Sequence, residues 1–126
     1  MIKVTIEEIL NATPALQILK EQNFDGMTAF KIARMLREVN KEIELFEQSR
    51  NELIEKFCIR DESGKIIENN GEIKIDSKYI NTFNNEIRKM LNNEIEINAV
   101  PLTLNILENL TITPEQAFNL EKFFEE

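Results

Sequence analysis

The clearest pattern along the chain is an apolar stripe between residues 27 and 58. One position recurs there at alternating steps of four and three, in the order Ile32, Leu36, Val39, Ile43, Phe46, Arg50, Leu53 and Phe57. Neither Gly nor Pro interrupts the segment, and polar or charged residues fill most of the other positions. This heptad spacing predicts a long amphipathic helix over 27–58. Because so narrow a stripe is stable only against a facing helix, either the same chain or a second copy must supply one.

A second, shorter stripe between residues 77 and 93 is the natural partner within the chain. Its apolar positions follow steps of three, four and three, at Ile80, Phe83, Ile87 and Met90. We therefore expect an antiparallel helical pair. The connection over 59–75 contains turn signals at Ser63-Gly64 and at 69–71, next to short β-prone runs. It predicts either a small hairpin at the tip of the helical pair or a mobile loop.

The C-terminal third of the chain predicts one strand and one helix. Apolar and polar residues alternate from Glu94 to Ala99, which is typical of a half-buried strand, and Pro101 ends the alternation. After an apolar run over 102–112, the segment Thr113–Gln116 has the form of a capping box with Pro in the first turn. We expect a terminal helix from there, whose apolar face is formed by Ala117, Phe118, Leu120, Phe123 and Phe124.

The first 26 residues predict two short helical segments. Ile2 and Val4 precede Thr5-Ile6-Glu7-Glu8, which is a second capping-box pattern. Thr13-Pro14 then indicates a new helical start, because Pro is favoured in the first turn of a helix. Asp25-Gly26 ends this region before the long helix.

Together these elements predict a single domain over 1–126 of the α+β class that is predominantly helical. We expect a long antiparallel helical pair with a small β-ribbon or sheet, and short terminal helices that fold against the base of the pair. A chain of 126 residues hides roughly two thirds of its unfolded surface, which is enough for one core. With 42% hydrophobic residues, the chain also lies far from the composition of disordered proteins.

The charge and the cysteine count narrow the expected partners and the compartment. The formal net charge of −8 disfavours direct binding to nucleic acid, which depends on cationic side chains, and suits a basic protein partner. Cys58 is the only cysteine, so no internal disulfide can form, as is typical of a reducing cytosol. The N-terminus lacks the basic start of a signal peptide, and no stretch reaches the roughly 18 apolar residues of a membrane span. We expect a cytoplasmic protein without membrane contact.

Candidate catalytic chemistry is sparse in this sequence. There is no histidine, and only three glycines occur, so the chain offers neither the commonest general base nor a glycine-rich phosphate loop. Cys58 without a histidine gives no thiol-protease arrangement. We therefore predict no catalytic residue, no cofactor and no metal ligand, and hence a protein that is not an enzyme.

Charged residues between positions 38 and 55 of the long helix are the candidate partner-binding residues. They are Glu38, Glu42, Glu44, Glu47, Arg50 and Glu55. The alternative for the carboxylates is a plain solvated helix face. Arg50 interrupts the apolar stripe, where a polar group can set register or partner choice through an ion pair with Glu86 on the facing helix. Alternatively, the Arg50 stem packs on the stripe while its charged head reaches water.

The first half of the same helix contains a basic cluster, formed by Lys31, Arg34, Arg37 and Lys41. One interpretation is a site for a phosphate group or an acidic partner. The other is a set of exposed ion pairs within the domain, each worth well under about 1 kcal/mol.

Four segments, in this order, resemble a family of small bacteriophage and prophage proteins of unassigned function. They are AFKIARMLREVNKEIELFEQSRNELIEKF, GKIIENNGEIKI, YINTFNNEIRKMLNNEIEI and TITPEQAFNLEKFFEE. The resemblance implies a viral or prophage origin, action in the cytoplasm of a bacterial host cell, and a host or phage protein as the partner. It implies one of two functions: an inhibitor that binds a host complex such as a bacterial defence system, or an accessory of virion or tail assembly. The family offers no functional residues to transfer.

Two further expectations concern the tip and the oligomeric state. The helix–ribbon–helix outline is similar to that of chaperones of the prefoldin kind, whose tips hold clients through exposed apolar residues. The corresponding residues here are Ile66, Ile67, Ile73 and Ile75. Helical seams also self-associate readily, so a homodimer through the seam is the other expectation.

Overall fold

The computed structural model describes residues 1–125, apart from the side chains of residues 69 and 109. Its α-helices are α1 (Ile6–Lys20), α2 (Gly26–Phe57), α3 (Ile80–Leu91) and α4 (Pro114–Asn119). Its strands are β1 (Ile2–Thr5), β2 (Glu68–Asn69), β3 (Glu72–Ile73), β4 (Glu94–Ile97), β5 (Leu102–Thr103) and β6 (Phe124–Glu125). Two 3₁₀ helices, η1 (Leu104–Asn109) and η2 (Glu121–Phe123), complete the described chain. The predicted class, α+β and predominantly helical, is confirmed.

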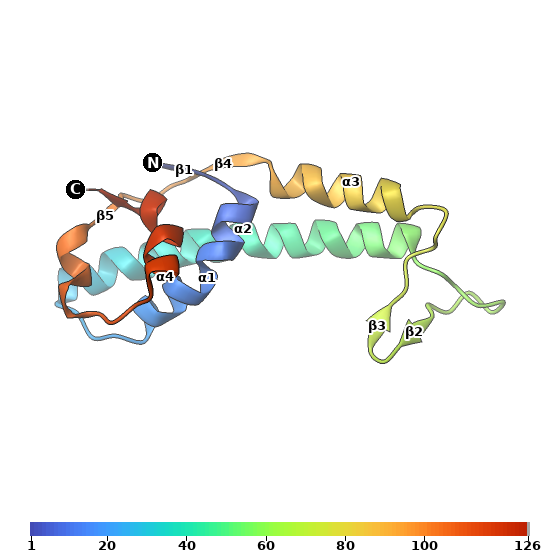
Figure 1. Ribbon diagram of the computed structural model, residues 1–126, viewed down its shortest axis with the longest axis horizontal. Coiled ribbons are helices and arrows are strands. Elements are labelled where there is room, and N and C mark those ends of the chain that lie inside the picture. Colours follow the sequence, from blue (N-terminus) through green and yellow to red (C-terminus); the bar gives the residue numbers. More distant parts are fainter. Residues whose placement is uncertain (126) are drawn as a thin grey trace.

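The molecule has three parts, arranged along α2 (Figure 1). A head at one end contains α1, α4, β1, β4, β5, β6 and the first half of α2. An arm consists of the second half of α2 and the antiparallel α3, as expected from the two apolar stripes. A tip, residues 58–79, connects the two helices of the arm and contains the β2–β3 ribbon.

The core lies in the head. Its fully buried residues include Val4, Ile9, Leu19, Met35, Val39, Ile97, Leu102, Leu120 and Phe123. In contrast, α3 has no fully buried residue, although its apolar residues Phe83, Ile87 and Met90 are all half-buried. Hydrophobic stabilisation is roughly proportional to apolar area removed from water, so it is concentrated in the head and weaker along the arm.

Helix α1 begins at the predicted capping box but does not restart at Pro14. Thr5 N–H donates to Glu8 Oε1 (2.9 Å), and Glu8 N–H donates to Thr5 Oγ1 (3.1 Å). The expected new helical start at Thr13-Pro14 is wrong, because α1 continues through Pro14 to Lys20. Ala12, Ala15 and Leu16 on either side of Pro14 are buried in the head, and this packing outweighs the local cost of a proline that points to solvent.

Helix α2 confirms the long helix, and its apolar stripe is covered by the same chain. Ile32, Met35 and Val39 belong to the head core, while α3 lies along the second half of the helix. Because α3 already occupies part of this seam, a homodimer through it stays a prediction. Arg50 is exposed although it lies on the stripe, and Glu86 pairs with Lys89 (3.4 Å) rather than with Arg50. The charged head of Arg50 stays in water because α3 covers only part of the surface of α2, so no desolvation cost is incurred.

The predicted strand near residue 95 finds its partner at the opposite end of the chain. β4 pairs antiparallel with β1, with Ile2 opposite Ile97 and Val4 opposite Ile95. In each strand the apolar residues alternate with more exposed ones, so one face of this two-stranded sheet is buried in the head.

The terminal helix is shorter than the apolar pattern predicts. Its capping box is confirmed, since Thr113 N–H donates to Gln116 Oε1 (2.9 Å) and Gln116 N–H donates to Thr113 Oγ1 (3.1 Å). However, α4 ends at Asn119, so the expected continuous helical face over Ala117–Phe124 is wrong. Phe123 is instead turned into the core, and β6 after it pairs in parallel with β5.

The connection over 59–75 is a small ribbon, in agreement with the hairpin prediction. β2 and β3 pair antiparallel around a turn in which Asn70 and Gly71 both have positive φ, at 56° and 81°. Single bridges between Cys58 and Ile75 and between Arg60 and Ile66 extend the ribbon toward the arm. Positive φ at two successive residues is typical of the type I′ hairpin turn, which explains the Asn-Gly pair.

Candidate partner-binding surfaces

The six predicted partner-binding residues all lie on α2, but the structure does not bring them onto one face. Glu42 is half-buried and faces the junction of the head and the arm. Glu44, Glu47 and Glu55 are exposed. At about 100° of rotation per residue, Glu44 and Glu55 point away from the stripe that is covered by the head and α3, Glu47 flanks that stripe, and Arg50 lies on it.

Glu38 forms ion pairs with two residues of the basic cluster. Glu38 is half-buried and lies 3.1 Å from Lys41 Nζ and 3.8 Å from Arg37 Nε. The guanidinium of Arg34 lies 5.8 Å from the centre of the exposed Phe30 ring. The interpretation of this cluster as ion pairs within the domain is thus confirmed for Arg37 and Lys41. No ion pair within residues 1–125 involves Lys31 or Arg34.

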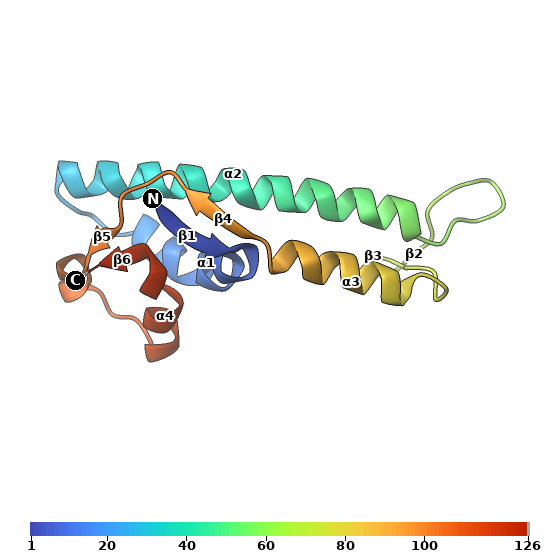
Figure 2. The ribbon, with the colours of Figure 1, turned by 90° about the horizontal axis from the view of Figure 1, so that it is seen from above.

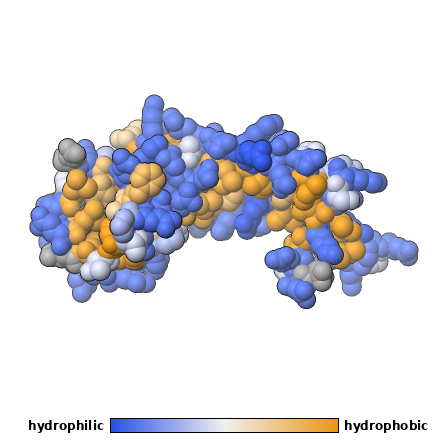
Figure 3. Space-filling view, in the orientation of Figure 1, coloured by the Kyte–Doolittle hydropathy of each residue, from blue (hydrophilic) through white to orange (hydrophobic). Residues whose placement is uncertain are grey.

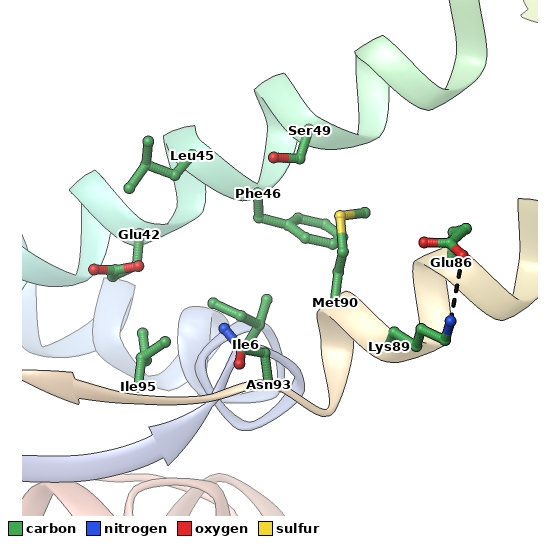
Figure 4. A pocket seen from close by; sticks show the side chains of 10 residues that line it. All are labelled: Ile6, Glu42, Leu45, Phe46, Ser49, Glu86, Lys89, Met90, Asn93 and Ile95. Carbon is green, nitrogen blue, oxygen red and sulfur yellow. Dashed lines mark hydrogen bonds and ion pairs between the residues drawn. The ribbon is translucent and has the colours of Figure 1, made fainter. Parts of the chain in front are cut away.

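A pocket of about 400 Å³ opens where the arm leaves the head, and we call it the junction pocket (Figure 4). Its apolar lining is Ile6, Leu45, Phe46, Met90 and Ile95. Its polar lining is Glu42, Ser49, Glu86, Lys89 and Asn93. The Phe46 ring and the Met90 side chain point toward each other across the floor, while Glu42 lies at the α2 side.

Three separate elements position this pocket. The backbone N–H of Ile6 donates to the carbonyl of Asn93 (3.3 Å), which fixes the start of α1 against the end of α3. Ser49 is a small residue where α2 faces α3, so the space that a larger side chain would fill stays open. Leu45 forms the rim and is 56% exposed. The pocket can therefore receive an apolar side chain, and the carboxylate of Glu42 favours a cationic group beside it, whereas Glu86 is already paired with Lys89.

Sequence reasoning predicted Glu42 but missed the pocket itself. Its walls come from segments that are far apart in the chain, at residues 6, 42–49 and 86–95. The one local signal was Ser49, a small polar residue beside an otherwise apolar stripe.

The tip presents half-exposed apolar residues next to an aromatic contact. Of the four isoleucines predicted to hold a client, Ile66, Ile73 and Ile75 are half-buried and Ile67 is exposed. Phe57 at the end of α2 packs against Tyr79, with ring centres 5.3 Å apart. In the space-filling view, apolar atoms cover much of the tip, and the molecule is hollowed between the tip and the head (Figure 3).

A second apolar surface lies on the head, between η1 and the C-terminal elements. Leu104, Leu107, Phe118 and Phe124 line a shallow groove there, with Glu121 and Glu125 at its border. Phe118 is 73% exposed, which is unusual for so large an aromatic side chain.

One ion pair joins the two ends of the head. Lys122 Nζ lies 2.8 Å from Glu8 Oε2. Partial burial raises the pKa of Glu8, but hydrogen bonds from Lys122 and Thr5 outweigh burial, so its pKa lies below the usual value. The hydrogen bond to Glu8 and the nearby carboxylates raise the pKa of Lys122. This pair holds η2 against the first turn of α1.

Residues 1–125 contain no group of three or more His, Cys, Asp or Glu side chains placed to hold a metal ion. Of the helices in that part of the chain, none combines the length and the apolar character that a membrane span requires. Comparison with protein-family models, with curated proteins and with solved structures finds no significant match for this chain.

Proposed function

We propose that this protein acts by binding another protein, and that the junction pocket is the centre of the binding surface. The observation that supports this is the combination of an apolar floor, Phe46 and Met90, with the carboxylate of Glu42 on a chain of net charge −8. Tight protein contacts centre on a buried apolar anchor surrounded by polar groups. The occupant is therefore a basic protein segment that inserts one apolar side chain beside a Lys or Arg.

The resemblance to small phage and prophage proteins supports a specific form of this proposal. We propose that the partner is a protein complex of a bacterial host, and that binding inhibits a host function such as defence, in the host cytoplasm. The inventory of side chains supports a non-enzymatic role, because a chain without histidine and with few glycines lacks the usual means of proton transfer and phosphate binding.

The second candidate function is an accessory of virion or tail assembly that acts in the manner of a chaperone. The exposed apolar residues at the tip favour it, since Ile67, Tyr79 and Ile80 are each at least a third exposed. In this case the occupied surface is the tip and the partner is a phage structural protein.

The test is a tagged pull-down from a bacterial lysate that contains the phage, followed by binding measurements with the purified partner. Three variants separate the surfaces. Ser49→Leu fills the junction pocket, Asn40→Leu makes a matched change at an exposed position of the same helix, and Glu44→Lys/Glu47→Lys reverses the outward acidic face.

Recovery of a host complex that is lost with Ser49→Leu and kept with Asn40→Leu supports the inhibitor proposal. If binding survives Ser49→Leu but is lost with the double charge reversal, the junction pocket is not the binding site. The exposed carboxylates of Glu44 and Glu47 would then be the candidates. Recovery of tail or capsid proteins alone, with host functions unaffected, overturns the inhibitor role and supports the assembly role.

A further inference from the structure

The side of α2 that faces away from the head and α3 is exposed to solvent along the whole helix. In Figure 2, α1, α3, α4 and the strands of the head all lie on one side of α2, and nothing in the described chain covers the other side. The helix has 32 residues, which corresponds to a length of roughly 48 Å. We call this surface the outer face; it consists of Met27, Phe30, Arg34, Arg37, Lys41, Glu44, Gln48, Glu52 and Glu55, and all nine are exposed.

The charges on the outer face are segregated by sign. The first half of α2, residues 26–41, contains four cations and one carboxylate, whereas the second half, residues 42–57, contains five carboxylates and two cations. Within residues 1–125, no ion pair involves Lys31, Arg34, Glu52 or Glu55. A helix of this kind has one basic and one acidic end on the same exposed surface.

This order of charges is self-complementary. When two copies of α2 lie antiparallel, Arg34 faces Glu52 and Lys41 lies opposite Glu44. The Arg34–Glu52 pair is centred at residue 43 and the Lys41–Glu44 pair between residues 42 and 43, so one two-fold axis at that point satisfies both. A parallel pair in register would instead place like charges against each other.

Exposed apolar side chains lie at the end of the same face. Met27 is 72% exposed and Phe30 is 63% exposed, and neighbouring exposed apolar side chains of this kind form a patch that another molecule can cover. In the antiparallel arrangement each Phe30 reaches the last turn of the other α2, next to Glu55 and Lys56, whose methylene groups can cover the ring.

We propose that the protein forms an antiparallel homodimer through the outer face of α2. The occupant is a second copy because a uniformly basic or uniformly acidic partner would meet like charges over half of this face. None of the residues that line the junction pocket belongs to the outer face, so its proposed partner and the second copy occupy separate surfaces. The dimer is therefore independent of the proposed function.

Charge exchange between two positions tests this arrangement. The variants are Arg34→Glu, Glu52→Arg and the two changes combined, with Lys20→Glu at the exposed end of α1 as a control whose charge change equals that of Arg34→Glu. Sedimentation velocity and light scattering after gel filtration measure the dimer at low salt, and circular dichroism checks that each variant is folded. All three substituted positions are exposed, so the fold does not depend on them.

We expect a dimer for the wild-type chain and for Lys20→Glu, and dissociation constants at least about tenfold higher for each single variant on the outer face. The combined variant regains the dimer. An equimolar mixture of the two single variants also regains it. In the mixed dimer, the glutamate introduced at position 34 of one copy faces the arginine introduced at position 52 of the other, and the second Arg34–Glu52 pair is unchanged. Raising the salt concentration weakens all of these dimers, since the pairs lie at the surface.

Three outcomes would overturn the proposal. The first is a wild-type chain that is monomeric up to about 1 mM, a concentration at which even a weak interface of this kind associates. The second is a dimer that both single variants leave unchanged, which would place the interface elsewhere. The third is a mixture of the single variants that stays monomeric, which would exclude the antiparallel pairing of these two positions.

Discussion

Lys122 Nζ lies 2.8 Å from Glu8 Oε2, so the last 3₁₀ turn of the chain is joined to the first turn of α1. Glu8 has a second role in the same place, because its side chain also accepts the backbone N–H of Thr5. A charge on Glu8 therefore stabilises both the contact between the termini and the beginning of α1.

This arrangement predicts a pH-dependent effect of Glu8→Gln. Glutamine can still accept the Thr5 N–H but cannot form the ion pair, so we expect a lower free energy of unfolding than for the wild-type chain at pH 7. Because the pKa of Glu8 is lowered in the folded state from 4.5, its contribution is present above that pH and is lost as the pH falls through the folded value. Urea unfolding between pH 3 and 7, in steps of about one unit, measures the difference. A difference that persists unchanged at the lowest pH would contradict the prediction.

The two phenylalanines on either side of Leu120 should differ sharply in their effect on stability. Phe123 is 1% exposed in the head core, whereas Phe118 is 73% exposed. We expect Phe123→Ala to lower the free energy of unfolding by about 3 to 5 kcal/mol, and Phe118→Ala to change it by less than about 0.5 kcal/mol. Denaturant unfolding measures both. Equal effects would show that the C-terminal segment does not pack as described.

Replacing the interior proline of α1 should stabilise the protein. Pro14 provides no backbone N–H for the carbonyl one turn earlier, and its ring faces solvent. For Pro14→Ala we expect the free energy of unfolding to rise by about 2 kcal/mol. Alanine is much more favourable than proline inside a helix, and this gain exceeds the stability that proline provides by restricting the unfolded chain. Thermal and urea unfolding measure the change. A loss of stability would mean that the proline ring makes contacts that an exposed position does not provide.

The β2–β3 turn should respond to substitution without affecting the head. Gly71 has φ of 81°, a conformation that costs a residue with a side chain about 1 kcal/mol, and none of the described side chains of β2 and β3 belongs to the core. We expect Gly71→Ala to speed amide hydrogen exchange in the ribbon while the midpoint of global unfolding stays the same. Gly26→Ala is the control, because no atom lies within 4 Å of the added Cβ and the backbone there is helical. A drop in the global midpoint for Gly71→Ala would mean that the ribbon unfolds together with the head.

The local elements of this protein were predictable where adjacent residues decide them. The capping boxes at Thr5 and Thr113 and the turn at Asn70-Gly71 involve partners within three residues in the chain. The stripe over 27–58 predicted α2 closely, because 3.6-residue periodicity depends only on the sequence of that segment. The prediction of a new helix at Pro14 was wrong because distant residues decide the structure there. The local preference of proline was outweighed by the burial of Ala15 and Leu16 in the head.

The candidate sites were predictable only in part. The charges on α2 identified candidate residues, but the sequence alone could not say which of them share a face, since that depends on where α1 and α3 pack. The interpretation that pairs Arg50 with Glu86 does not hold, because α3 leaves Arg50 in water. The junction pocket depends on Ile6, Ser49 and Met90 lying together, and no local pattern links these three positions.

The sequence by itself determined α2 and α3, the capping boxes, the turn of the ribbon and the segregation of charge along α2, because each of these depends on short-range geometry or on side-chain chemistry. The tertiary structure decided which faces are covered. It paired β1 with β4, turned Phe123 into the core and placed the rest of the head and α3 on one side of α2. The physical reason is that burial of apolar surface is non-directional and draws together residues from any part of the chain, so the exposed surfaces are known only once the whole chain is packed.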